Sequence, residues 1–254
     1  MAQDLNVPRT RLILEAVAAL IVVYIMIIVV VTGAYFAVEG YNQESITGLV
    51  ERSPDALAFV QELKFLTKPV AMLLAVFTVF FMLKLRDKGF QDIGLKKPDN
   101  IAKTILYGIG IAAAVYVVGF GVQWVMAKGG HVSDTSSFNI VQGNLGFYLF
   151  AMTIISWVSA AFCEEVIFRG FILNNLAQVF ENTNTGFILA IVIQAIVFGL
   201  LHESQGLAGM VIIGAMALVF GFAYFKFRNL WPLIIGHALV NNYSFTMLYL
   251  QNSG

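Results

Sequence analysis

The chain has 254 residues, of which 59% are hydrophobic and only 12% are charged. A soluble domain carries about 25% charged residues, so this chain has too few charges to cover a soluble globule of its size. Basic and acidic residues balance at 15 each, so the net charge points to neither nucleic acid nor an acidic partner, and the single cysteine excludes an intrachain disulfide.

Long stretches without Asp, Glu, Lys or Arg recur along the chain and predict membrane-spanning helices. Six of them hold between 20 and 29 residues, and a helix needs about 20 apolar residues to cross the hydrocarbon core. They cover 16–38, 104–127, 135–163, 182–201, 204–225 and 229–254. The sequence therefore predicts an all-α fold, a polytopic transmembrane helical bundle of about seven to eight spans.

The first span is predicted to be a retained helix rather than a signal peptide. Its apolar run is longer than a signal-peptide core, and no small-residue cleavage site follows it. A mostly polar loop comes next, in which Leu57–Leu66 is predicted to form an interfacial amphipathic helix.

A seventh, shorter stretch of 15 residues lies between Lys68 and Lys84 and begins at Pro69. It is predicted to span the membrane with both lysines extended towards the interface. The prolines at positions 8, 69 and 232 are expected at the starts of spans, where a missing N–H group costs nothing.

Positive charge predicts the orientation of the bundle. With loops assigned alternately to the two sides, one side collects 11 basic residues and the other collects 4. The 11 are Arg9, Arg11, Lys84, Arg86, Lys88, Lys96, Lys97, Lys103, Arg169, Lys226 and Arg228. The sequence therefore predicts a multi-pass protein of the cell membrane with a cytoplasmic N-terminus and an external C-terminus. No segment outside the spans is large enough to fold alone, so residues 1–254 are predicted to form a single membrane domain.

Ionisable side chains inside apolar spans are costly, and each is therefore a functional hypothesis. The segment Cys163–Arg169 carries two adjacent glutamates between apolar sequences. Glu165 and Arg169 are four residues apart and can pair on a helix, which leaves Glu164 without a local partner and free to act as a base. A pair of interfacial glutamates is the alternative interpretation. Cys163 is expected to be an ordinary buried residue.

Two further pairs of side chains share a helix face at a spacing of four residues. Phe198 and His202 lie at the end of one span, and His202 alone would be interpreted as structural. His237 and Asn241 lie inside the last span, where they offer two hydrogen-bond donors to one cavity or join neighbouring helices.

The short turn Asn182–Thr185 suggests that these groups meet. Residues equidistant from the turn of a helical hairpin face each other, and Glu164 and His202 each lie 19 residues from Thr183. A helix running from about Leu145 to Phe180 would be long enough to protrude from the membrane.

The three motifs together resemble those of the CAAX-protease and bacteriocin-processing family, the Abi group, which includes the eukaryotic Ras-converting CAAX endopeptidase. They are Glu164-Glu165-x-x-x-Arg169, Phe198-x-x-x-His202 and His237-x-x-x-Asn241. The segment Asp92–Pro98 also resembles a short upstream segment of bacterial members, so the resemblance covers roughly residues 90–245.

The resemblance implies that the chain is an intramembrane endopeptidase acting on a membrane-associated protein or peptide. It implies that Glu164 is the base that activates a water, that His202 assists, and that His237 and Asn241 stabilise the oxyanion. Arg169 would hold Glu165 or meet a substrate carboxylate, and Phe198 would support the site. Membrane lipid is the other expected partner.

Zinc bound by Glu164, His202 and His237 is the alternative for the same site. We favour a mechanism without a cofactor, because no HExxH pair lies on one helix. A non-proteolytic immunity or binding protein of the same family, and a small transporter that uses the glutamates as a proton relay, are the remaining hypotheses. A transporter is expected to contain an inverted repeat, and none is detected.

Overall fold

The computed structural model describes residues 7–40, 47 and 54–251, and throughout these residues the ordered elements are helices. The longer helices are α1 (Arg9–Glu39), α3 (Pro54–Lys84), α4 (Ile101–Lys128), α7 (Asn184–Leu200), α8 (Gly206–Phe227) and α9 (Trp231–Leu250). A further long helix is built from α5 (Leu145–Phe150), η3 (Ala151–Ile172) and α6 (Leu173–Val179). The short helices η1 (Phe90–Ile93), η2 (Ser136–Val141) and η4 (Glu203–Gln205) lie in connections.

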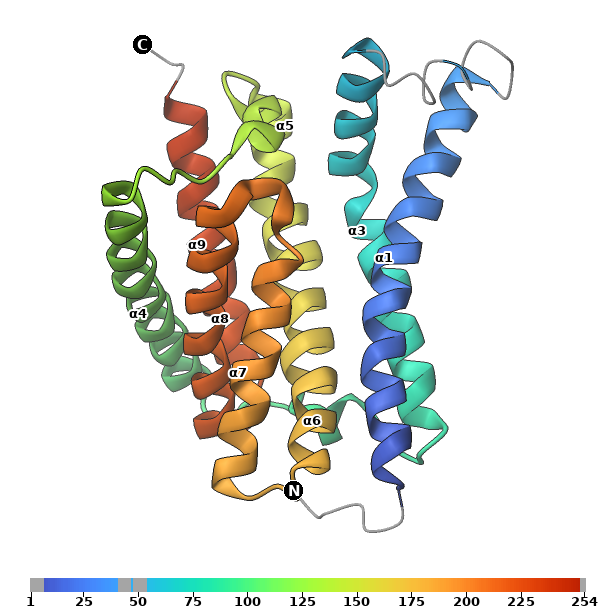
Figure 1. The fold of residues 1–254 in the computed structure, drawn as a ribbon, viewed down its shortest axis with the longest axis vertical. Coiled ribbons are helices and arrows are strands. Elements are labelled where there is room, and N and C mark those ends of the chain that lie inside the picture. The colour runs from blue at the N-terminus through green and yellow to red at the C-terminus, as the bar shows by residue number, and fades with distance from the viewer. Residues whose placement is uncertain (1–6, 41–46, 48–53, 252–254) are drawn as a thin grey trace.

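The long helices run side by side along the long axis of the molecule, and the start of α1 and the end of α9 lie at opposite ends of the bundle (Figure 1). Within the described residues, five helices are long and apolar enough to cross a membrane, and α7 is a shorter apolar helix. The predicted all-α, polytopic bundle is therefore confirmed.

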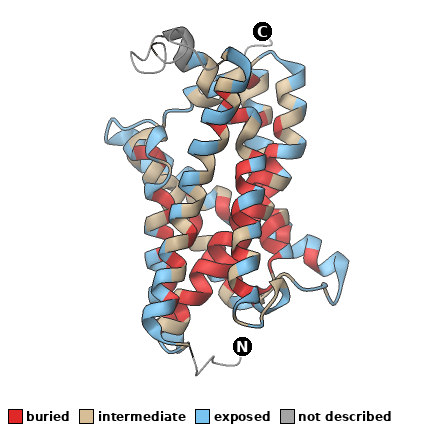
Figure 2. Cartoon of the chain, turned by 90° about the vertical axis from the view of Figure 1, so that its right-hand side faces the viewer, coloured by how far each residue is buried: buried red, intermediate tan, exposed pale blue. Residues whose placement is uncertain are grey.

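The outer faces of the bundle are apolar and exposed, whereas its interior holds the core (Figure 2). In the five candidate spans, only 11% to 39% of the most apolar window is buried. Large aliphatic side chains such as Ile25, Leu106 and Val117 point outwards. A soluble protein rarely exposes such continuous apolar surface, and lipid tails are its natural environment.

The central helix runs without a break from Leu145 to Val179, as the sequence predicted. The Asn144 side chain caps its start by accepting a hydrogen bond from the Phe147 amide. Its middle part, η3, has the wider π-type hydrogen bonding, which is frequent at functional sites. The turn after it contains Glu181 and Asn182 with positive φ, and Thr183 caps α7. The predicted hairpin turn is thus confirmed.

Helix α3 differs from the sequence prediction. It is one continuous helix from Pro54 to Lys84 with Pro69 inside it, so Leu57–Leu66 is its first half and not a separate interfacial helix. Pro69 was expected to start a span, and that expectation is wrong. The consequence is that Lys68 lies within the bundle, far from the ends of its helix.

Close backbone contact between α4 and α9 positions the last helix. A Cβ atom added at Gly236 would lie 2.9 Å from the backbone oxygen of Gly108, which is too close for any side chain. Glycine is therefore required for this approach. Because Gly236 immediately precedes His237, the contact also sets the depth of that histidine in the core.

Candidate active site

Glu165 on η3 is the centre of a buried polar cluster. One carboxylate oxygen accepts a hydrogen bond from Arg169 Nη1 at 3.0 Å and lies 2.8 Å from His237 Nδ1 on α9. The pairing of Glu165 with Arg169 confirms the spacing argument from the sequence. The bond to His237 joins residues 72 positions apart and was not predicted. This cluster fixes α9 against η3 at the depth of the motifs.

The buried guanidinium of Arg169 lies between two aromatic rings. Its central carbon is 4.6 Å from the ring centre of Phe198 and 5.1 Å from that of Phe220. Aromatic faces attract a desolvated cation, which offsets part of the cost of burying it. Phe198 and Phe220 thus both contact Arg169, and Phe220 was not singled out from the sequence.

Glu164 is buried beside Glu165 and has a partner that sequence reasoning missed. Lys68 Nζ on α3 lies 3.2 Å from its carboxylate. The lysine side chain is 31% exposed, whereas that of Glu164 is only 8% exposed. Lys68 therefore supplies the positive charge that a buried carboxylate needs. The sequence held one sign of this contact. The charge-free run after Lys68 has only 15 residues, too few to span a membrane alone, so a spanning helix there has to include Lys68 itself.

His202 lies at the end of α7, and its ring is held by its own helix. Nδ1 lies 2.8 Å from the carbonyl oxygen of Phe198, and the two rings are 4.9 Å apart. The Phe198 ring in turn packs edge-on against Phe168 of η3. Glu164 interacts electrostatically with both His202 and His237, so the structure brings these three ionisable groups together.

The bonds at Nδ1 restrict what each histidine can do. A carbonyl or carboxylate oxygen can only accept, so Nδ1 carries the hydrogen in both rings. In the neutral form Nε2 is then an acceptor, which suits His202 as an assistant base. His237 can donate from Nε2 only when both ring nitrogens carry a hydrogen.

Asn241 lies one helical turn after His237 on α9 and is half-buried. It is therefore on the same helix face as His237. Cys163 is fully buried and unpaired, as expected of a packing residue. His131, which the sequence analysis did not retain as a candidate, is exposed in a loop.

The residues proposed for zinc do not form a metal site in this arrangement, although one feature of the histidines is shared with metal ligands. Bonding of the remote ring nitrogen to an oxygen is typical of metal-ligating histidines. However, among the residues that the structure describes, no three His, Cys, Asp or Glu side chains are grouped closely enough to hold a metal. The ammonium group of Lys68 also donates a hydrogen bond to the Glu164 carboxylate, which a metal ion would have to replace. The site in this arrangement does not fit a zinc ion.

Two comparisons with known proteins find similarity to membrane peptidases. Residues 146–243 match the family described as type II CAAX prenyl endopeptidase Rce1-like. The chain is also 26% identical over 170 residues to a Bacillus subtilis (strain 168) protein named "Putative membrane peptidase YdiL". Both similarities agree with the resemblance to the CAAX-protease and bacteriocin-processing family that the three motifs indicate.

The family match and the site coincide. All seven residues singled out from the three motifs lie within 146–243, whereas Lys68 lies outside it. The alignment with the Bacillus protein covers 65% of this chain and 65% of the relative, just under two thirds of each. No solved structure matches the chain.

Proposed function

We propose that this protein is an intramembrane endopeptidase that hydrolyses a peptide bond in a membrane-associated protein or peptide. The observation that carries the proposal is the buried pair Glu164 and Glu165 with two oriented histidines. One glutamate is bound to a partly exposed lysine and can reach a substrate, and the other holds His237 and Arg169. Glu164 is thus the reactive carboxylate, and Glu165 is the positioning carboxylate.

Glu164 acts as the general base in this mechanism. It removes a proton from water with the help of His202, and the water oxygen attacks the carbonyl carbon of the substrate. His237 as an imidazolium and Asn241 stabilise the negative oxygen that forms. The tetrahedral intermediate then collapses, the C–N bond breaks, and the leaving amine receives the proton that Glu164 accepted.

Arg169 and Phe198 support the site and do not react. Arg169 neutralises Glu165, and Phe198 contacts the guanidinium on one side and His202 on the other. Phe198 therefore links two of the three motifs. The substrate class that we propose, a CAAX-type peptide, comes from the family and not from these contacts.

The substitution Glu164→Gln tests the proposal, because it keeps the size of the side chain and removes its capacity to accept a proton. The full chain in detergent is assayed with two labelled CAAX peptides, one prenylated and one not, and binding and cleavage are measured separately. We expect the variant to bind the peptide and to lose cleavage by at least about 10²-fold. Glu203→Gln, which removes an exposed carboxylate near His202, is the control and should cleave normally.

Near-normal cleavage by Glu164→Gln would refute the assignment of the base. If the wild-type protein binds peptide and never cleaves it, the non-proteolytic binding protein becomes the better interpretation.

A further inference from the structure

A polar cavity lies at the opposite end of the bundle from the chain's C-terminus and takes no part in the proposed reaction. It has a volume of about 370 Å³, within the range of about 300–1,000 Å³ that is usual for small-ligand sites. It is formed where α3 and α8 end, beside the last turns of α6 and the segment around η1. This segment includes Asp92–Pro98, the part of the family resemblance that the proposed mechanism leaves without a role.

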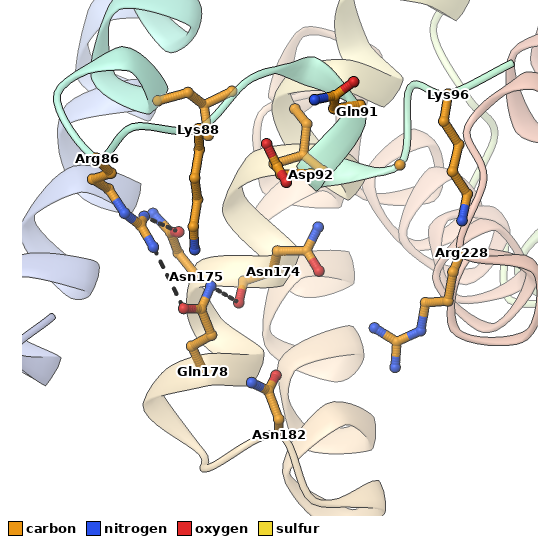
Figure 3. A pocket seen from close by; sticks show the side chains of 13 residues that line it. Arg86, Lys88, Gln91, Asp92, Lys96, Asn174, Asn175, Gln178, Asn182 and Arg228 are labelled. Atoms are coloured by element: carbon orange, nitrogen blue, oxygen red, sulfur yellow. Dashed lines mark hydrogen bonds between the residues drawn. The ribbon is translucent and has the colours of Figure 1, made fainter. Parts of the chain in front are cut away.

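The charges that line this cavity are predominantly positive. Figure 3 shows Arg86 and Lys88 on one side and Lys96 and Arg228 on the other. Asp92 is the acidic residue of the lining, and its carboxylate accepts a hydrogen bond from the Gly89 amide at 2.7 Å. The local field therefore favours an anion.

Amide side chains from α6 and the turn after it lie between the two basic pairs (Figure 3). Asn175 is 2% exposed, and its oxygen accepts from Arg86 Nη1 at 3.0 Å. Its buried amino group has no hydrogen-bond partner, and the same holds for the amino group of Asn182. Buried donors are costly unless they meet an acceptor. The cavity thus combines positive charge with unused donors.

The framework around these donors is rigid. Arg86 also binds Glu15 of α1 and Gln178, so α1, α3 and α6 are joined there. Asn174 donates to the Tyr224 hydroxyl, which donates to the Ile93 carbonyl at 2.8 Å. The donors are therefore held in place before any ligand arrives, which reduces the cost of binding.

We propose that this cavity is a binding site for a phosphate-bearing anion. A phosphate group carries negative charge and several acceptor oxygens, which match both features of the lining. A phospholipid headgroup and free phosphate share this chemistry. The site is separate from Glu164, so it is independent of the proposed endopeptidase activity.

The substitution Asn182→Asp tests the site. Aspartate keeps the shape of asparagine and tolerates the positive φ of 53° at this position, but it puts a negative charge where the anion would bind. Asn184→Asp is the matched control, because it makes the same change two residues away, at the exposed first residue of α7, and does not line the cavity. A second variant, Lys88→Gln with Lys96→Gln, removes two positive charges without altering the amides.

Binding is measured on the full chain in two arms. One titrates inorganic phosphate against the detergent-solubilised protein, and the other titrates vesicles of phosphatidylcholine with and without phosphatidylglycerol. Saturable binding of phosphate alone identifies a soluble anion, and saturable binding only of the phosphatidylglycerol vesicles identifies a lipid headgroup. In either case we expect Asn182→Asp and the double lysine variant to weaken binding by at least about tenfold, with Asn184→Asp and Glu164→Gln unchanged.

Two results would overturn the proposal. One is the lack of saturable binding in both arms. The other is equal binding by Asn182→Asp and its control, which would attribute the affinity to general surface charge. A circular dichroism spectrum of each variant shows whether it is folded, and the double lysine variant keeps the test decisive if Asn182→Asp does not fold.

Discussion

His237 Nδ1 on α9 lies 2.8 Å from a carboxylate oxygen of Glu165 on η3, and the same oxygen accepts from Arg169. One atom thus holds together a histidine and an arginine from two helices. Since all three side chains are buried or nearly so, this contact serves the fold as well as the site.

Glu165→Gln should therefore be mainly a stability variant. It leaves the buried Arg169 without its counter-charge, and removing one partner of a buried ion pair costs about 3–5 kcal/mol. Chemical unfolding in detergent, monitored by circular dichroism, measures this loss. Glu203→Gln, at an exposed position, should stay within about 0.5 kcal/mol of the wild type. A Glu165→Gln protein as stable as that control would show that the pair does not hold α9 in place.

Lys68 and Glu164 should be energetically coupled. Lys68→Met leaves a buried carboxylate without its cation, and we expect a loss of about 1–3 kcal/mol because the lysine is partly exposed. In the double variant with Glu164→Gln the charge is gone as well, so its loss should be smaller than the sum by about 0.5–3 kcal/mol. Additive losses in this double-mutant cycle would mean that the 3.2 Å contact carries no net energy.

Gly236→Ala should force α9 away from α4. The added methyl group would meet the backbone oxygen of Gly108 and the side chain of Ile111, and overpacking of this kind costs about 1–3 kcal/mol. Since His237 is the next residue, cleavage should fall as well. Gly110→Ala is the control on α4, where an added Cβ meets nothing within 4 Å. Thermal unfolding and peptide cleavage are measured for both variants. Equal unfolding temperatures and equal cleavage rates for Gly236→Ala and Gly110→Ala would contradict this expectation.

Activity is expected to survive strong chelators. The proposed base and oxyanion donors are protein groups, so EDTA or 1,10-phenanthroline should leave the cleavage rate within about twofold of its starting value, and purified protein should contain less than stoichiometric zinc. Inhibition by chelator that is reversed by added zinc would instead favour Glu164, His202 and His237 as metal ligands.

The charge distribution predicts where each loop lies. A reporter that is active only in the cytoplasm should work when inserted next to Lys96 and fail when fused to the C-terminus. The start of α1 and the end of α9 lie at opposite ends of the bundle (Figure 1). An active C-terminal fusion would reverse the orientation.

The sequence was sufficient for features that depend on local spacing. The pairing of Glu165 with Arg169, the turn at Asn182–Thr185 and the long central helix all follow from positions along one or two helices. The contacts of Lys68 with Glu164 and of His237 with Glu165 join segments 96 and 72 residues apart. Helix periodicity specifies which face a residue occupies but not which distant helix covers that face. Pro69 was expected to start a helix because proline is common at that position. The structure instead has Pro69 inside the continuous helix α3, where tertiary packing outweighs the low helix propensity of proline.

Pro69 has a mechanical consequence for Lys68, its neighbour in α3. Proline has no N–H group to donate to the carbonyl four residues earlier, so a helix bends more easily there than elsewhere. Lys68 Nζ lies 3.2 Å from the Glu164 carboxylate, so a bend of α3 at Pro69 would change the distance between these two groups. The position of the proline thus links the shape of α3 to the charge that Glu164 experiences.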